Sequence, residues 1–258
     1  MERRFTFDQV ADIYSTVRPA YPESLVDDVL SFAALARDDA ILEIGCGTGQ
    51  ATRSFAARGF PMFAIDPGAE MLRAACASLV EFANIEFAQA TFETWSGKPA
   101  SFRLIIAAQS WHWIEPQRRY VKAAGLLSPS GSLAVFGHVP VGLPAALREP
   151  FRQAFLRHVG AWGRPPEAWY LPDGPFEKWF DESGLFGPVE HRSYPWQWRH
   201  NASSYVDFLR TRSDLRMLGA ATREALLEEI AVAIGDHGGT FEVDYQTHLY
   251  IARCVHRH

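Results

Sequence analysis

One short stretch, residues 41–50 (ILEIGCGTGQ), constrains the fold more than any other part of the chain. Its apolar half predicts a buried strand, and Gly45, Gly47 and Gly49 predict a tight loop before a helix over about residues 51–58. Glycine has no Cβ, so the backbone amides of such a loop can approach a ligand closely. The N-terminus of the following helix directs its amides and its dipole at the same place. The pattern therefore predicts a cradle for a cofactor.

The spacing of the glycines separates two classes of cofactor. Dinucleotide sites use G-x-G-x-x-G against a pyrophosphate, whereas here the third glycine comes one residue early. Glu43 precedes the loop, where a carboxylate suits an amine-bearing or cationic ligand better than a diphosphate. S-adenosylmethionine carries both an ammonium and a sulfonium group, so these features favour it over NAD. The alternative for Glu43 is a strand carboxylate that caps a neighbouring loop.

A second acid ends the next predicted strand. The apolar run from Met62 leads to Asp66, where a carboxylate can accept hydrogen bonds from both ribose hydroxyls of a nucleoside. The alternative is a cap for the helix that begins after Pro67. Because NAD and S-adenosylmethionine both contain ribose, Asp66 predicts a nucleoside but does not distinguish between these two cofactors.

On these residues the sequence resembles the class I S-adenosylmethionine-dependent methyltransferases, and within them the small-molecule branch that includes trans-aconitate and ubiquinone-pathway methyltransferases. The resemblance covers most of residues 7–137 and is weaker beyond them. It implies that the glycine loop is the family's first motif, that S-adenosylmethionine is the cofactor, and that S-adenosylhomocysteine is its product. The cofactor-binding residues that follow from the loop and the resemblance are Glu43, Gly45, Cys46, Gly47, Gly49, Asp66, Pro67, Thr91, Phe92, Gln109 and Tyr14.

Some of these roles lie outside the glycine loop and rest on the resemblance. Thr91 and Phe92 fall where the family's adenine-contacting loop lies. Gln109 follows the fourth strand and contacts the methionine part or the acceptor, or is a strand-end amide that bonds to backbone. Tyr14 lies in the N-terminal segment that folds over the cofactor in the family, or is an ordinary tyrosine at a helix edge.

Two positions depart from the pattern of the family. Arg103 replaces the usual acid of a Phe-Asp-Leu sequence, and Ser130 replaces a glycine of the turn after Pro129. Neither lies in the glycine loop, so the prediction of the cofactor is unaffected.

Strands and helices are predicted to alternate through the first half of the chain. Most of these strands are continuous apolar runs, which indicates a parallel sheet covered on both faces. We therefore predict an α/β fold with three layers, doubly wound, in which a mostly parallel seven-stranded sheet has an antiparallel last strand and helical lid insertions. The predicted strands of this half are residues 40–45, 61–66, 84–88, 102–108 and 131–137, and the predicted helices are 50–58, 68–80 and 116–126.

The 258 residues are predicted to form one methyltransferase domain, because a 48% hydrophobic chain of this length can bury one large core. Its parts are an N-terminal helical cap (1–35), a cofactor-binding core (36–137), a proline-rich lid insertion (138–175), and the rest of the sheet (176–258) with a helical insertion near 200–235. Five tryptophans of the second half either line an acceptor pocket or seal the lid onto the core. They are Trp162, Trp169, Trp179, Trp196 and Trp198.

His112 is the candidate catalytic residue. Methyl transfer mainly requires that acceptor and methyl group be held in line, and a base is needed only if the acceptor must lose a proton. His112 stands between Trp111 and Trp113 after the strand that should present the acceptor, and its ordinary pKa of about 6.5 suits a general base. The alternative is a histidine that hydrogen-bonds near the cofactor or shapes the pocket.

Composition excludes several other classes of protein. A net charge of -5 argues against a broad nucleic-acid surface, and three separated cysteines argue against structural zinc and disulfides. No histidine spacing predicts a metal, and no apolar run approaches the ~20 residues of a membrane span. We expect a cytoplasmic monomer or homodimer that methylates a small molecule. The alternatives are a non-catalytic S-adenosylmethionine-binding protein and an NAD(P)-dependent oxidoreductase, and the sequence leaves oxygen, nitrogen and carbon acceptors open.

Overall fold

A seven-stranded sheet runs through the protein, with the strand order β3-β2-β1-β4-β5-β7-β6. The computed structural model describes residues 3–255, so residues 1–2 and 256–258 of the predicted domain lie outside it. The first five strands of this order pair in parallel, and β7 runs antiparallel to both β5 and β6. The predicted fold class is confirmed. The strands are β1 (Ala40–Ile44), β2 (Met62–Asp66), β3 (Ile85–Gln89), β4 (Phe102–Ala108), β5 (Leu127–Gly142), β6 (Glu190–Asn201) and β7 (Thr240–Arg253).

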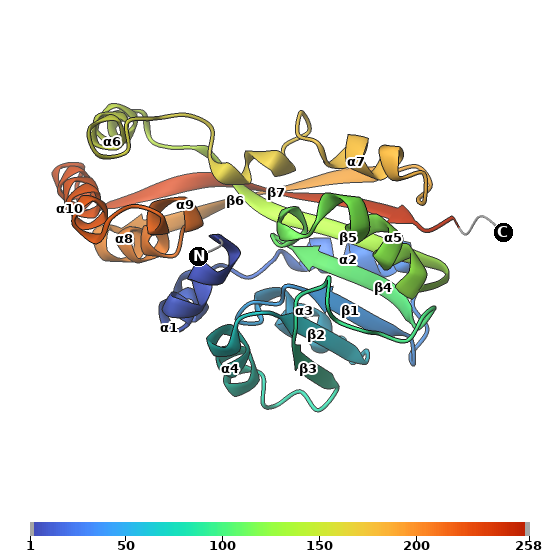
Figure 1. Ribbon diagram of the computed structural model, residues 1–258. Helices are drawn as coiled ribbons and strands as arrows, with labels where there is room; N and C mark the ends of the chain where they lie inside the picture. Colours follow the sequence, from blue (N-terminus) through green and yellow to red (C-terminus); the bar gives the residue numbers. More distant parts are fainter. Residues whose placement is uncertain (1–2, 256–258) are drawn as a thin grey trace.

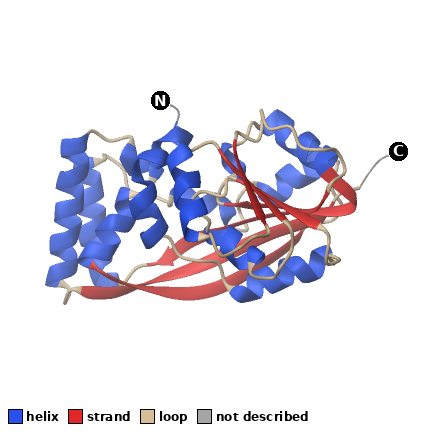
Figure 2. Cartoon of the chain, turned by 90° about the horizontal axis from the view of Figure 1, so that it is seen from below, coloured by secondary structure: helices blue, strands red, loops and turns tan. Residues whose placement is uncertain are grey.

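Helices cover both faces of this sheet, as Figures 1 and 2 show. On one face α5 (Pro116–Leu126) and α7 (Phe176–Ser183) pack on residues of β1, β4, β5 and β7. On the other face α2 (Glu23–Ala33) and α3 (Gln50–Ala56) pack on the alternate residues of the same strands. Side chains of a strand point alternately to the two faces, so both sets must be apolar, which explains the continuous apolar runs.

A second group of helices covers the far ends of β6 and β7. It consists of α6 (Ala145–His158), α8 (Ala202–Arg210) and α10 (Ala220–Asp236), beside the short α9 (Ser213–Arg216). These helices bury their apolar faces against Phe241, Val243 and Tyr245 of β7 in a separate core. Figure 1 places them together at one end of the molecule, at the tips of the long antiparallel strands. No helix within residues 3–255 has the length and apolar character to cross a bilayer.

Strand β5 is longer than predicted. The expected strand ends at residue 137, but β5 continues to Gly142, and its register with β7 runs from Ser132 opposite Arg253 to Gly142 opposite Asp244. The segment predicted as a lid from residue 138 therefore begins in the sheet. Pairing with a strand from the other end of the chain extends β5 through His138 and Pro140, and local sequence carries no signal for such pairing.

Arg103 and Ser130, the two positions that depart from the family pattern, lie close together near the beginning of β4, at the end of the strands away from the glycine loop. Ser130 has a positive φ of 60°, a conformation that glycine adopts more easily. Arg103 donates to the backbone oxygen of Pro129 at 2.8 Å and to that of Ala33 at 3.2 Å. The arginine thus ties the end of α2 to the turn that precedes Ser130.

Candidate functional site

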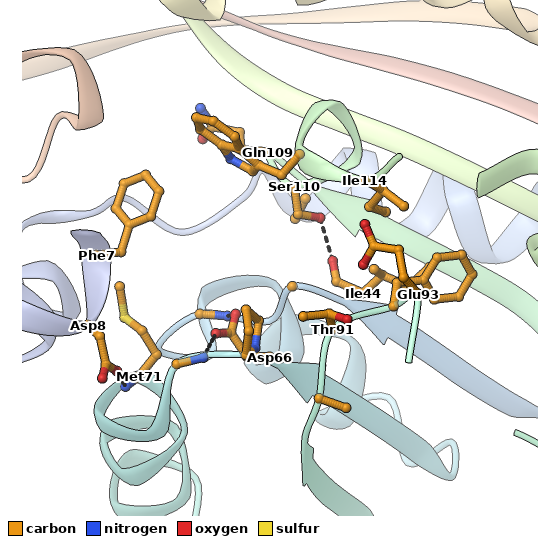
Figure 3. A pocket seen from close by; sticks show the side chains of 18 of the residues that line it. Phe7, Asp8, Ile44, Asp66, Met71, Thr91, Glu93, Gln109, Ser110 and Ile114 are labelled. Carbon is orange, nitrogen blue, oxygen red and sulfur yellow. Dashed lines mark hydrogen bonds between the residues drawn. The ribbon is translucent and has the colours of Figure 1, made fainter. Parts of the chain in front are cut away.

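The carboxyl ends of β1, β2, β3 and β4 surround a cavity in the candidate site, which we call the main cavity. Its space, including the part that is open to solvent, is about 820 Å³. In Figure 3, Asp66 lies below Gln109 and Ser110, with Phe7 and Asp8 on one side and Thr91 and Glu93 on the other. The lining residues are Phe7, Asp8, Tyr14, Ile44, Gly45, Gly47, Asp66, Pro67, Gly68, Met71, Ala90, Thr91, Phe92, Glu93, Ala108, Gln109, Ser110, Trp113 and Ile114.

The predicted glycine loop follows β1 and forms part of this wall. Gly45 has a φ of 70°, and a Cβ on it would lie 2.5 Å from the Cβ of Ser110. The Ser110 hydroxyl donates a short hydrogen bond to the Ile44 carbonyl, so the approach is fixed from both sides. Gly49 also has a positive φ, of 92°, but it does not line the cavity, and a Cβ on it would lie 2.6 Å from the Leu79 side chain. The absence of a Cβ at Gly45 therefore lets the loop approach Ser110 at the cavity, whereas its absence at Gly49 lets Leu79 pack behind the loop.

Asp66 connects the loop to the end of β2. One carboxylate oxygen accepts from the Gly47 amide at 2.9 Å, and the other accepts from the Gly68 amide at 2.8 Å. Burial raises its pKa to about 6, although the amides of Gly68 and Gly47 oppose this shift. Each oxygen keeps a lone pair that can accept a ribose hydroxyl. Pro67, the next residue, lines the main cavity as well.

Asp8 caps the helix that follows Asp66, which is the alternative role predicted for Asp66 itself. Its carboxylate accepts from the amides of Glu70 and Met71, at 2.6 Å and 3.1 Å, in the first turn of α4 (Ala69–Ser78). Asp8 belongs to η1 (Arg3–Val10) and lines the main cavity. The cap thus fixes the N-terminal segment beside the cavity.

A smaller space, the inner chamber, opens beside the main cavity and contains Glu43. Burial raises the pKa of Glu43 to about 8, and neither carboxylate oxygen has a hydrogen-bond partner among the described residues. A buried carboxylate without a partner is unfavourable, and a cation in the chamber would compensate it. The lining residues are Tyr14, Arg18, Pro19, Tyr21, Glu43, Gly45, Cys46, Gly47, Gln50, Ala51, Ala108 and Gln109.

Gln109 stands where the main cavity and the inner chamber meet, since it lines both. Its φ of 53° is unusual for a residue other than glycine. Its amide donates to the Phe136 carbonyl at 2.8 Å, and its side-chain oxygen accepts from the Tyr21 hydroxyl at 3.4 Å. A strained backbone of this kind is often found at functional sites, where the surrounding structure holds it in place.

The N-terminal segment closes the inner chamber. Tyr14 lines both spaces and packs edge-on against Phe7, with ring centroids 5.9 Å apart. The Arg18 guanidinium lies 4.8 Å from the ring centres of both Tyr14 and Phe208, and its Nε donates to the Thr211 hydroxyl at 3.0 Å. Arg18 therefore connects the N-terminal cap to α8, which lies far away in sequence. Arg18 also lines the inner chamber, as Glu43 does.

Thr91, Phe92 and Glu93 form one wall of the main cavity. The Thr91 hydroxyl is 3.0 Å from that of Thr94, in the turn that follows β3. Phe92 is buried against Trp111, so its ring is fixed from behind. This wall is the adenine position that the resemblance implies, and that role stays a prediction.

His112 does not line the main cavity or the inner chamber, although its neighbours Ser110 and Trp113 line the main cavity. It lies in η2 (Trp111–Trp113), half-buried, with its Nδ1 3.5 Å from the Tyr170 hydroxyl. Its ring also contacts those of Trp113 and Trp169. The structure thus places His112 against η3 (Pro166–Tyr170), and its role as a base stays a prediction.

The five tryptophans of the second half lie in two kinds of surroundings, and their predicted role in an acceptor pocket stays a prediction. Trp169 and Trp179 pack on each other, with ring centroids 5.6 Å apart, and Trp179 also covers the Arg119 guanidinium. Trp196 stacks on Tyr245, whereas Trp162 and Trp198 line cavities. The prediction could not assign them singly because their roles depend on which helix each faces.

Several residues of the site were not singled out from the sequence. Asp8, Arg18, Tyr21 and Ser110 reach the site from elements that lie far from the glycine loop in sequence. The signal that could have identified Ser110 is its place directly after Gln109 at a strand end; Asp8 gives no such signal. Within residues 3–255, no three His, Cys, Asp or Glu side chains lie close enough together to hold a metal ion.

Comparison with known proteins links the core of the chain to one family model. Residues 41–131 match a family described as a methyltransferase domain. An uncharacterized methyltransferase of Mycobacterium tuberculosis is 32% identical over 130 residues, which are 50% of this chain and 51% of that protein. A Saccharomyces cerevisiae protein described as a probable S-adenosylmethionine-dependent methyltransferase, CRG1, is 30% identical over 56% of this chain and 52% of its own length. The chain thus spans about half the length of these curated relatives.

Solved structures share the fold over nearly the whole chain. A protein from Anaeromyxobacter dehalogenans, described as a candidate type II methyltransferase, aligns with a TM-score of 0.62 at 22% identity, over 92% of this chain and 97% of its own. Phosphoethanolamine N-methyltransferase 2 of Haemonchus contortus, in complex with phosphomonomethylethanolamine and S-adenosylhomocysteine, aligns with a TM-score of 0.55 at 14% identity. That alignment covers 95% of this chain and 57% of the other. At these identities the likeness concerns the fold alone.

Proposed function

We propose that this chain, which belongs to the class I S-adenosylmethionine-dependent methyltransferases through residues 41–131, transfers a methyl group from S-adenosylmethionine to a small-molecule acceptor. The observation that carries the proposal is the pairing of a main cavity bounded by Asp66 with an inner chamber that holds the unpartnered carboxylate of Glu43. S-adenosylmethionine consists of a nucleoside and an amino acid joined through sulfur. Its nucleoside would match the main cavity, and its amino acid would match the inner chamber.

The residues of the inner chamber fit the methionine part of the cofactor. Glu43 would accept the ammonium group, which would compensate a buried carboxylate that has no partner. Arg18 lines the same chamber and would bind the carboxylate, because a guanidinium presents several donors to such a group. Opposite charges on the chamber wall thus match the two charges of an amino acid.

The residues of the main cavity fit the adenosine part. Asp66 would accept the ribose hydroxyls, and Thr91 and Phe92 would contact the adenine. The glycine loop would let the backbone at Gly45 and Gly47 approach the ligand without a Cβ in the way. When bound, S-adenosylmethionine supplies a methyl group activated by the positive sulfur.

Two further facts support a small acceptor. The net charge of -5 gives no broad basic surface for nucleic acid. The phosphoethanolamine methyltransferase of Haemonchus contortus, which shares the fold, was solved with a small molecule. Neither fact identifies the acceptor of this chain.

Binding experiments test the proposal against its alternatives. S-adenosylhomocysteine should raise the melting temperature of the purified protein, whereas NAD and NADP should leave it unchanged, because only the former matches both spaces. Stabilisation by NAD alone would support the oxidoreductase alternative. Binding of S-adenosylmethionine without methyl transfer to any acceptor would support the non-catalytic alternative.

The placement of His112 leads to a separate prediction. Because its side chain lines neither the main cavity nor the inner chamber, His112→Ala should change the dissociation constant of S-adenosylhomocysteine by less than about threefold. If His112 is nevertheless the base, kcat should fall by at least about a hundredfold. An unchanged kcat at saturating substrate would remove His112 from the mechanism.

A further inference from the structure

A second cavity, which we call the outer cavity, lies at the end of the molecule that holds α6 and α8 (Figure 1). Its volume is about 640 Å³, within the range of small-molecule sites. Its wall is formed by α6, by residues 159–166, by α8 and the residues after it, and by residues 140–143 at the end of β5. None of the residues that line it lines the main cavity or the inner chamber. The outer cavity is therefore separate from the spaces assigned to the cofactor.

Much of the wall of the outer cavity is apolar. Its apolar side chains include Phe151, Phe155, Leu209, Val243 and Trp162. The rings of Phe155 and Trp162 meet edge to face, with centroids 5.2 Å apart, and the Trp162 side chain is 39% exposed. A concave surface of this kind gains free energy when it covers an apolar ligand. The outer cavity thus suits a ligand with an apolar body.

Arg212, which lies between α8 and α9, contributes a charged donor to this wall. Its side chain is 12% exposed, and its Nε and Nη2 donate to the Asp214 carboxylate at 3.1 Å and 2.8 Å. Its Nη1 has no hydrogen-bond partner among the described residues and retains accessible surface. Because two bonds to Asp214 fix the plane of the guanidinium, Nη1 is held in place as a donor for a further acceptor.

The Tyr205 hydroxyl is a second donor in the same wall. It has no hydrogen-bond partner among the described residues and retains accessible surface, while its ring stacks on Phe151 with centroids 5.6 Å apart. Burial raises the pKa of Tyr205 to about 12, and the charge of Arg212 opposes this shift, so the two groups are close enough to interact. The phenol stays protonated near pH 7 and can donate to a ligand beside Arg212.

Arg148 adds a positive charge at the rim of the outer cavity. It is an exposed residue in the first turn of α6, and its Nε donates to the Leu143 carbonyl at 2.9 Å. No carboxylate among the described residues forms an ion pair with it. Its charge is therefore available to attract an anion to the cavity.

The wall carries more positive than negative side chains. Three of the described residues that line it are arginines, and Asp214 alone is acidic. Asp214 is already paired with Arg212, and Arg164 pairs with Asp173, outside the wall, at 2.8 Å. Glu167, whose charge also acts on Arg212, lines a different cavity. The polar groups that remain for a ligand are thus donors, which favours an anion over a cation.

We propose that the outer cavity binds a small organic acid as a second ligand, apart from the cofactor. The carboxylate of this acid accepts hydrogen bonds from Arg212 and Tyr205, and Arg148 attracts it from the rim. The apolar wall covers the rest of the molecule. This inference does not rest on the proposed function, because the outer cavity shares no lining residue with the cofactor site.

Three probes that share one carbon skeleton test the charge of the ligand: phenylbutyrate, phenylbutanamide and phenylbutylamine. Titration calorimetry and the change in tryptophan emission measure their binding. We expect the acid to bind with a Kd below about 1 mM, the amide to bind at least about tenfold more weakly, and the amine not to bind. No binding of the acid, or equal binding of the acid and the amide, would overturn the inference.

Variants of the donors test the position of the carboxylate. Replacing Arg212 by Gln together with Asp214 by Asn removes both charges of the pair, and it should weaken binding of the acid at least about tenfold. Tyr205→Phe keeps the ring against Phe151 and should weaken it at least about threefold. Wild-type affinity for the acid in both variants would contradict the inference.

A variant at an exposed position provides a test that does not depend on the folding of the buried ones. Arg148→Gln should weaken binding of the acid about threefold, because an exposed charge contributes little. The matched control is Arg152→Gln, on the same helix but outside the wall of the cavity, which should leave binding unchanged. Equal effects of the two substitutions would contradict a role for Arg148.

Tryptophan emission locates the bound acid. Trp162→Phe should abolish most of the change in emission, whereas Trp169→Phe, an exposed tryptophan that does not line the outer cavity, should preserve it. The acid should bind equally well with and without saturating S-adenosylhomocysteine. Competition between the two would place the acid in the cofactor site and overturn the inference. Failure of S-adenosylhomocysteine itself to bind would contradict only the proposed function, so the two failures are distinguishable.

Discussion

Replacing Glu43 by Gln should stabilise the protein without ligand by about 2 kcal/mol near pH 7 and weaken binding of S-adenosylhomocysteine at least about tenfold. The two effects have opposite directions because the same carboxylate is unfavourable when alone and favourable when paired with an ammonium group. Glutamine keeps the size of the side chain but carries no charge.

The pH dependence of stability follows from the raised pKa of Glu43. Burial moves this pKa from 4.5 to about 8, so between these values the folded protein keeps a proton that the unfolded chain has released. Its contribution therefore lowers the free energy of unfolding as pH rises through this window and becomes constant above about 8. The difference in stability between Glu43→Gln and the wild type should grow over the same window.

Urea unfolding of both proteins from about pH 5 to about pH 8 measures this difference. Other groups, such as the buried His138, titrate in both proteins and cancel in the comparison. Below about pH 8, binding of S-adenosylhomocysteine should release a proton from Glu43 in the wild type only. Glu228→Gln, at an exposed position on α10, serves as the control. A difference that does not vary with pH would contradict the account of Glu43.

Replacing Gly45 by Ala should abolish measurable cofactor binding and destabilise the protein by about 3 kcal/mol. The added Cβ would lie 2.5 Å from the Cβ of Ser110, and alanine is disfavoured at a φ of 70°. This clash can be relieved only if the glycine loop or the end of β4 shifts, and both form part of the wall of the main cavity. The change therefore acts on the shape of the site as well as on folding.

Two further variants separate the clash from the backbone strain. Gly59→Ala meets the same kind of strain, at a φ of 86°, but no atom lies within 4 Å of its Cβ, so it should cost only about 1 kcal/mol and leave binding intact. Ser110→Gly combined with Gly45→Ala removes the atom that clashes and should restore part of the binding. Equal losses for Gly45→Ala and Gly59→Ala, measured by unfolding and titration calorimetry, would contradict the close approach.

Most of the sheet could be predicted because its signals are local. Buried parallel strands need apolar side chains on both faces, so strands such as β4 (Phe102–Ala108) are visible as uninterrupted runs. Three alternate glycines marked the loop, and residues 41–131, which include it, match a family described as a methyltransferase domain. The extension of β5 to Gly142 was missed because it depends on pairing with β7, about a hundred residues away in sequence.

The site shows the same division between local and distant signals. Glu43 and Asp66 lie on β1 and β2, and Gly45 directly follows β1, so all three could be identified from the sequence around them. Asp8 and Arg18 act through contacts made only when the N-terminal segment folds back, onto α4 and α8 respectively. The branch of the family, the site residues and the acceptor stay proposals, because each depends on contacts with a ligand.

Titration calorimetry of the unmodified protein with S-adenosylhomocysteine tests the central assignment most directly. The account predicts binding to one site per chain in the micromolar range, with release of a proton near neutral pH as Glu43 takes up its ammonium partner. No heat with S-adenosylhomocysteine or S-adenosylmethionine, together with tight binding of NAD, would contradict it.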